Sequence, residues 1–308
     1  MGHTDGSAAL PLEHPALTTR AGGILSKVLQ VRRLLDRGDS GLAGLVAAEV
    51  ARLARDLEAY LTPEQIAAAE SRLPRQRWHK KLVELSVLDG YAKWAPSYDG
   101  EANPLIHVEE PVTLALIGDV SGKDVLDAAC GTGRYALRLA QAGARVCGVD
   151  GCEEMLALAK GKRDELGLAV DLRCSDLARL PFADASFDVV VCALALCHVA
   201  GIGPPIAEFA RVLRPGGRLV ISDFHPYGLV VGWRTRFDDE TTSHFIENHT
   251  HMIADHYAAL TAAGLALSDM REELVDERLT GVIGQEEVER FRGMPIALVI
   301  AAEKKGTT

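Results

Sequence analysis

The chain lacks the features that mark a membrane-spanning or secreted protein. None of its apolar runs reaches the about 18 residues that a spanning helix needs. Residues 1–15 (MGHTDGSAALPLEHP) also lack the basic start and apolar core of a secretory signal. We therefore expect a cytoplasmic protein that does not enter a membrane.

The chain also has fewer positively charged than negatively charged residues. The 308 residues include 33 Lys and Arg against 43 Asp and Glu, which gives a formal net charge of -10. A nucleic-acid binder normally presents a basic surface, because phosphate contacts dominate its affinity. We expect no nucleic-acid partner, and we interpret the basic stretch Arg72–Lys81 as a solvated helix face.

The cysteines match no zinc pattern, and the chain has no C-x-x-C pair. A cytosolic protein usually keeps its thiols reduced. We therefore expect buried free thiols and no metal site, with thiol-based metal chemistry as the alternative. The six cysteines are Cys130, Cys147, Cys152, Cys174, Cys192 and Cys197.

The length suggests two units, or one domain with a large extension, at roughly 150 residues per domain. Residues 1–20 show no periodicity and are expected to form a flexible tail. Residues 21–90 carry apolar side chains at helical spacing, and Thr62-Pro63-Glu64-Gln65 is typical of a helix start. This helical segment precedes a different pattern, which we assign to one domain at residues 91–308.

From Val125 onward, short β-rich runs alternate with helical patterns, which predicts a parallel sheet covered on both faces. The predicted strands are VLDAA, RVCGVD, VDLRCS, FDVVVCAL and GRLVISDF, followed later by Ala266–Glu273 and Ile296–Ala302. The predicted helices are Arg134–Gln141, Glu153–Glu165, Pro205–Leu213 and Met252–Ala263.

A glycine turn follows the first of these strands. Gly131 and Gly133 let the backbone approach a ligand without a Cβ in the way, and the next helix offers free N–H groups. Asp150 ends the second strand, where a carboxylate can accept hydrogen bonds from ribose hydroxyls. These two features alone fit both a nicotinamide dinucleotide and S-adenosylmethionine.

Further elements distinguish the two cofactors. Ser175-Asp176-Leu177, Leu180-Pro181-Phe182 with Phe187-Asp188-Val189-Val190, and Leu213-Arg214-Pro215-Gly216-Gly217 follow in order. With the D-x-x-C-G-T-G run they make the sequence from about Tyr91 to Ala302 resemble the class I S-adenosylmethionine-dependent methyltransferases of small molecules. The resemblance implies a Rossmann-like α/β fold with a seven-stranded, mostly parallel sheet and helices on both faces, preceded here by the N-terminal helical segment.

The resemblance also implies cofactor contacts. Asp127 and the Gly131 loop would face the methionine part, Asp150 would hold the ribose, and Asp176 would accept from the adenine amino group. Ala129 departs from the glycine that the family often has at its position, and Cys152 is a poorer helix cap than Ser or Asp. The full predicted cofactor set is Tyr98, Asp127, Ala129, Gly131, Gly133, Asp150, Gly151, Met155, Ser175, Asp176, Leu177, Ala193 and His198.

Histidines are the natural acid–base groups near neutral pH. His198 follows the fourth strand and His225 follows the fifth, both at the edge where ligands bind in open parallel sheets. We predict His225 as the base or substrate hydrogen-bonder and His198 in the same cavity. The alternative is that each only bonds the backbone. The stretch ENHTH suggests a metal, but no third ligand lies at suitable spacing.

Residues 225–250 are long for a connection inside a compact domain, and such loops are usually functional. In this family such insertions form a lid over the substrate, with a surface hairpin as the plainer interpretation. Residues 21–90 would close the pocket from the other side or form a homodimer contact. The predicted substrate contacts are Tyr91, Tyr227, Trp233 and His249, with Phe237 as a further wall.

The activity that these features predict is transfer of a methyl group from S-adenosylmethionine to O or N of a small, aromatic or natural-product-like acceptor. The product of the cofactor would be S-adenosylhomocysteine. The alternatives are methylation at carbon, a non-methylating enzyme that binds the same cofactor, an NAD oxidoreductase, and a non-catalytic protein that keeps the fold.

Overall fold

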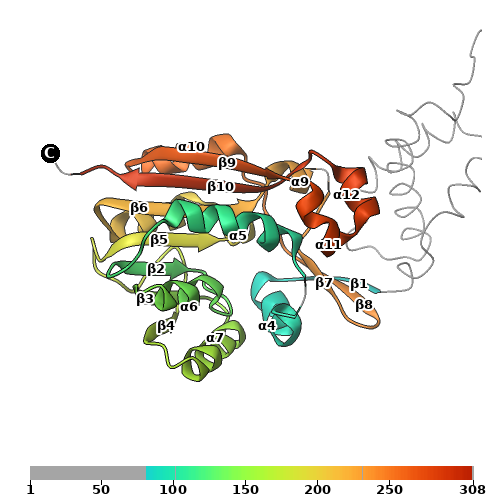
Figure 1. The fold of residues 1–308 in the computed structure, drawn as a ribbon, viewed down its shortest axis with the longest axis horizontal. Coiled ribbons are helices and arrows are strands. Elements are labelled where there is room, and N and C mark those ends of the chain that lie inside the picture. Colours follow the sequence, from blue (N-terminus) through green and yellow to red (C-terminus); the bar gives the residue numbers. More distant parts are fainter. Residues whose placement is uncertain (1–80, 101, 231, 307–308) are drawn as a thin grey trace, which may run out of the picture. The chain divides into compact units, whose positions relative to one another are not determined.

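The computed structural model describes residues 81–306 apart from 101 and 231. The predictions for the tail at 1–20 and for the helices before residue 81 therefore lie outside the described residues. The described part begins with β1 (Lys81–Leu85) and α4 (Val87–Tyr98), which start before the predicted domain boundary at residue 91 (Figure 1).

The central sheet has seven strands in the order β4-β3-β2-β5-β6-β10-β9. All neighbouring pairs from β4 to β6 are parallel, whereas β10 is antiparallel to both β6 and β9. The predicted seven-stranded, mostly parallel sheet is confirmed (Figure 1). Its strands are β2 (Asp124–Ala128), β3 (Arg145–Asp150), β4 (Val170–Cys174), β5 (Phe187–Ala193), β6 (Leu213–Phe224), β9 (Leu265–Leu274) and β10 (Pro295–Lys304).

Helices cover both faces of this sheet, because successive strand residues point to opposite sides. In β5, Val190 and Cys192 pack with Phe209 of α8 (Gly203–Val212) and with α10 (Ile253–Ala262). Val189 and Val191 pack on the other face with Tyr135 and with the helices α5 (Pro104–Ile117), α6 (Arg134–Gln141) and α7 (Glu153–Glu165). The alternation in a single strand therefore builds two separate cores.

The insertion predicted at 225–250 folds into α9 (Pro226–Val230) and a hairpin of β7 (Arg236–Asp238) and β8 (Thr242–Ile246). β8 also pairs in parallel with β1, which gives a second, three-stranded sheet in the order β1-β8-β7 (Figure 1). The remaining described elements are η2 (Leu196–His198), η3 (Glu277–Leu279), α11 (Thr280–Ile283) and α12 (Gln285–Phe291).

All six cysteines are free. Cys130, Cys152, Cys192 and Cys197 are buried, Cys147 is partly buried and Cys174 is exposed, so the expected burial holds for most thiols but is wrong for Cys174. Among the described residues, no helix is both long and apolar enough to cross a bilayer. The same residues contain no group of three or more His, Cys, Asp or Glu side chains that could hold a metal ion.

Candidate cofactor and acceptor site

The loop between β2 and α6 folds back on itself through residues with positive φ. Gly131 has φ 52° and Gly133 has φ 87°, values that glycine adopts without cost. A Cβ at Gly133 would lie 3.1 Å from Leu137 and 3.3 Å from Ala159, so the backbone there runs against the helices. Ala129 takes the same region at φ 66°, which explains why glycine is common at this position.

Asp150 connects the end of β3 to this loop. The backbone N–H of Gly131 donates to one carboxylate oxygen (2.7 Å), and the N–H of Cys152 donates to the other (2.8 Å). Burial raises the pKa of Asp150, and the bonds from the backbone N–H groups oppose that shift. Each oxygen keeps a further lone pair, so the carboxylate fits the predicted role of accepting from two ribose hydroxyls.

Asp127 lies beneath the same loop, 1% exposed, and accepts the backbone N–H of Ala136 at 2.8 Å. Burial is the main cause that raises the pKa of Asp127 to about 7, against the opposing effects of the Ala136 hydrogen bond and the Arg134 charge. Its carboxyl therefore changes charge near neutral pH. A cation placed above the loop would favour the ionised form.

The adenine side of the predicted site follows β3 and β4. Met155 is 2% exposed and packs with Ala95 and Cys152. Gly151 is exposed in the turn between β3 and α7. Asp176 is exposed and accepts the backbone N–H of Ala178 (2.8 Å). Ser175 is partly buried and donates to carbonyls of its own turn, and Leu177 and Ala193 pack at the edges of the two cores.

Helix α4 lies against the glycine loop and α7, and its aromatic residues follow helical spacing. Tyr91, Trp94 and Tyr98 contact one another, with ring centroids 4.9–6.1 Å apart. Asp99, directly after the helix, accepts from the Thr132 hydroxyl (2.7 Å) and pairs with Lys162 (2.9 Å). These contacts hold α4 beside the glycine loop.

His198 lies in η2, directly after β5. The chain turns there through Leu194 at φ 55°, whose N–H donates to the carbonyl of Ser222. The Nδ1 of His198 lies 2.7 Å from the carbonyl oxygen of Glu247, and its Nε2 lies 2.9 Å from the Tyr91 hydroxyl. Burial is the main cause that lowers the pKa of His198.

His225 directly follows β6 and is 5% exposed. Its Nδ1 accepts the backbone N–H of Tyr227 (3.1 Å), and its Nε2 lies 2.9 Å from a carboxylate oxygen of Glu272 on β9. Both ring nitrogens thus have partners within the protein. A catalytic role for His225 stays a prediction, and it would require the Tyr227 N–H to release the Nδ1 lone pair.

The ENHTH stretch holds η2 in place. The N–H of His249 donates to the carbonyl of Cys197 (2.7 Å), and the His251 ring bonds the carbonyl of Val199 (2.8 Å). His249 Nε2 lies 3.3 Å from the Glu247 carboxylate. These histidines therefore act on the backbone of the turn that carries His198.

Two further predicted substrate contacts lie around α9. Tyr227 is 46% exposed, whereas Trp233 stacks near Phe224 and meets the Phe291 ring edge-on at 5.2 Å. Phe237 stacks on Trp94 at 5.1 Å, so the hairpin packs directly on α4. The structure thus brings Tyr91 and His198 together, while Tyr227, Trp233 and His225 gather around α9.

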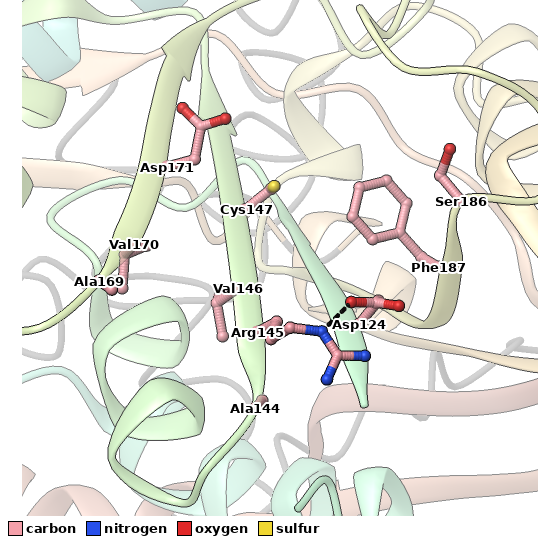
Figure 2. Close-up of a pocket in the computed structure, with 10 residues that line it drawn as sticks. All are labelled: Asp124, Ala144, Arg145, Val146, Cys147, Ala169, Val170, Asp171, Ser186 and Phe187. Carbon is pink, nitrogen blue, oxygen red and sulfur yellow. Dashed lines mark hydrogen bonds and ion pairs between the residues drawn. The ribbon is translucent and has the colours of Figure 1, made fainter. Parts of the chain in front are cut away.

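A separate cavity lies at the opposite end of the strands (Figure 2). Asp124, Arg145, Val170 and Phe187 line it, and these residues begin β2, β3, β4 and β5. Arg145 and Asp124 form an ion pair of 2.6 Å at its rim. Asp150 ends its strand, so this cavity lies away from the cofactor loop.

Sequence reasoning missed three buried or bridging carboxylates. Asp99 directly follows Tyr98, a predicted cofactor contact, and this position was a usable signal. Glu109 is 0% exposed and accepts from Arg134, Tyr135 and Thr113, but nothing in its local sequence predicts this. Asp223 accepts the N–H groups of Cys197 and Phe224 and thereby fixes the turn before His198.

Comparison with known proteins agrees with this geometry. Residues 126–221 match the family model described as a methyltransferase domain. The demethylmenaquinone methyltransferase of Thermus thermophilus is 41% identical over 126 residues, which cover 39% of this chain and 56% of that protein. The ubiquinone biosynthesis O-methyltransferase of Idiomarina loihiensis is 38% identical over 134 residues, 42% of this chain and 54% of that protein.

The chain thus spans little more than half the length of these curated relatives. A solved S-adenosylmethionine-dependent methyltransferase from Mesorhizobium loti has a TM-score of 0.53 at 21% identity, covering 70% of this chain and 99% of that chain, which shows a shared fold. The loop, the Asp150 carboxylate and the matched family fit one cofactor, S-adenosylmethionine. Residues 126–221 therefore match a methyltransferase domain, and the fold around them is the one found in a solved S-adenosylmethionine-dependent methyltransferase.

Proposed function

We propose that this chain transfers a methyl group from S-adenosylmethionine to O or N of a small aromatic acceptor. The observation that carries the proposal is the double hydrogen bond of Asp150, to the N–H groups of Gly131 and Cys152. This carboxylate joins the glycine loop to the end of β3 and prepares a nucleoside site before any ligand arrives. Preorganised sites of this kind spend little binding energy on ordering.

When bound, the cofactor supplies an electrophilic methyl on a sulfonium. The chain's own residues would bind and orient: Asp150 the ribose hydroxyls, Asp127 the methionine ammonium, and Met155 with Leu177 the adenine. Tyr98 on α4 would cover the loop and exclude water. Methyl transfer of this kind depends mainly on positioning two reactants in line.

The class of acceptor is inferred from the aromatic residues near the carboxyl ends of the strands and from the relatives. Tyr91, Tyr227 and Trp233 would supply flat apolar walls. The relatives are named for quinone pathways, so phenols and quinols are the acceptors to test first. His198 and His225 are the proposed proton-handling groups for a hydroxyl or protonated amine.

Calorimetric titration with S-adenosylmethionine and S-adenosylhomocysteine tests the cofactor half of the proposal, with NAD as the control ligand. We expect micromolar affinity for the adenosyl ligands and a loss of at least about 100-fold on Asp150→Ala, because two loop contacts and the ribose contacts disappear together. Binding of NAD alone would contradict the proposal.

Turnover is measured with a cofactor that carries a deuterated methyl group and a panel of phenols, quinols and aromatic amines. Mass spectrometry then identifies the methylated atom. Methylation at carbon would overturn the choice of atom, and tight cofactor binding without methylation of any acceptor would favour a non-methylating enzyme.

A further inference from the structure

A tyrosine and a histidine from distant parts of the chain form a direct pair. The Tyr91 hydroxyl on α4 lies 2.9 Å from Nε2 of His198 in η2, and the two rings meet edge-on with centroids 5.3 Å apart. The two residues are 107 positions apart in sequence. Their contact joins the aromatic helix to the turn after β5.

The second ring nitrogen decides which partner donates. His198 Nδ1 lies 2.7 Å from the carbonyl oxygen of Glu247, and a carbonyl can only accept. Nδ1 therefore carries the proton, and in neutral imidazole Nε2 holds a lone pair. It follows that the Tyr91 hydroxyl donates to Nε2.

The phenol oxygen keeps its own lone pairs. Among the described residues, the Tyr91 hydroxyl forms no hydrogen bond other than that to His198. The Tyr91 ring packs with Cys152 and Met155, which follow Asp150, while its hydroxyl faces the turn after β5. The Tyr91 side chain therefore extends from the residues after β3 to the turn after β5.

We propose that Tyr91 and His198 form a proton relay, in which the Tyr91 oxygen contacts the acceptor hydroxyl and His198 receives the proton. This relay rests on the proposed function. The acceptor oxygen forms its bond to the methyl carbon as the carbon–sulfur bond breaks, with that electron pair left on sulfur. The acceptor proton passes to the Tyr91 oxygen, the Tyr91 proton passes to His198 Nε2, and the resulting imidazolium later releases it to solvent.

The surroundings hold both groups in the charge states that the relay needs. Burial is the main cause that raises the pKa of Tyr91 and lowers the pKa of His198, so the phenol stays protonated and the imidazole neutral at pH 7. The charged or titratable groups that act on His198 are Glu247 and His249 after β8 and Asp223 at the end of β6. At saturating cofactor, kcat should therefore stay flat around pH 7 and fall only below the usual His range.

Two conservative variants distinguish a proton relay from a Tyr91–His198 hydrogen bond that only holds α4 against η2. Tyr91→Phe keeps the ring but removes the hydroxyl, and His198→Gln keeps an acceptor for Tyr91 but cannot take up a proton. With a weakly acidic phenol as acceptor we expect kcat to fall about 100-fold or more in each, with S-adenosylhomocysteine affinity unchanged. With a phenol already ionised at the assay pH, the loss should shrink to less than about threefold.

Tyr257→Phe, a change on the exposed face of α10, is the matched control and should leave turnover unchanged. His225→Gln tests the rival base. The relay alone is overturned if His198→Gln turns over as fast as the wild type. It is also overturned if either variant loses the same fraction of kcat with acidic and with weakly acidic phenols. Absence of turnover in the wild type for every acceptor overturns the relay together with methyl transfer.

A spectroscopic readout is independent of turnover. In ¹⁵N-histidine-labelled protein at pH 7, we expect His198 to show protonated Nδ1 and unprotonated Nε2, assigned by loss of its signals in His198→Gln. The Nε2 resonance should shift in Tyr91→Phe and stay in place in Tyr257→Phe. An Nε2–H tautomer or an imidazolium at pH 7 would overturn the relay.

Discussion

Burial within the fold determines the charge of Asp127 near neutral pH. Burial raises the pKa of its carboxyl to about 7, so much of the ligand-free protein carries a neutral Asp127 below that pH. The methionine ammonium of the cofactor would favour the carboxylate. Binding should therefore release a proton below pH 7, and affinity should fall by up to about tenfold per pH unit as the pH drops from 7 toward 5.

Calorimetry in two buffers of different ionisation enthalpy measures how many protons are released on binding. Asp127→Asn keeps an oxygen for the Ala136 N–H but cannot titrate, so its weaker affinity should show no slope over this range. S-adenosylhomocysteine, which shares the ammonium but has no sulfonium, should behave as the cofactor does. An unchanged slope in Asp127→Asn would show that another group releases the proton, and Asp150, whose pKa is also raised by burial, is the first to test.

Single residues were predictable where their role depends on local chain geometry. Gly131, Gly133 and Asp150 could be placed from their positions at strand ends and in a tight turn. The tautomer of His198 could not, because it depends on a carbonyl 49 positions away. The same holds for His225, whose partner Glu272 lies on a strand that follows much later.

At the scale of elements, the β7–β8 hairpin and α4 depend on one aromatic stack. Phe237 is 6% exposed and lies between Trp94, at 5.1 Å, and His244, at 4.8 Å. Phe237→Ala should lower the free energy of unfolding by about 3 kcal/mol, because it removes a buried ring and leaves a cavity. Cofactor affinity should fall as well, since α4 loses one of its supports.

Urea denaturation and calorimetry measure these two effects. Tyr257→Ala removes a ring that is 55% exposed and should change stability by no more than about 0.5 kcal/mol. If Phe237→Ala costs less than about 1 kcal/mol, or if cofactor affinity is unchanged, the hairpin does not support α4 as described.

Elements were predictable where turn residues bracket a clear period. α6 and α7 have the predicted bounds, and the predicted strands are displaced by a few residues at most. α5 was missed because Pro111 lies inside it and its apolar residues show no single face. β1 was missed because it is a five-residue strand whose partner, β8, follows much later in the chain.

At the scale of the whole described unit, ligand binding should stabilise the segments that follow the carboxyl ends of β2 and β3, and it should leave β9 and α12 unchanged. We expect S-adenosylhomocysteine to slow hydrogen exchange in residues 129–133, in the turn after β3 and in α4, because these segments share the contacts of Asp150 and Asp99. Exchange in β9 and α12 should not change.

Peptide-level mass spectrometry resolves these regions, and Asp150→Ala at the same ligand concentration provides the unliganded reference. Uniform protection across the unit, or protection confined to the cavity at the start of β2 and β3, would place the ligand elsewhere.

The parallel pairing of β8 with β1 has a consequence for protein engineering. The insertion after β6 is a continuous segment that could be chosen for exchange between proteins. Its strand β8, however, hydrogen-bonds to β1, which precedes α4. A chimera that grafts residues 225–250 alone onto another host would leave that strand edge bare and prone to pairing with other molecules. Recombination between related chains must therefore inherit Lys81–Leu85 together with the hairpin to keep this three-stranded sheet.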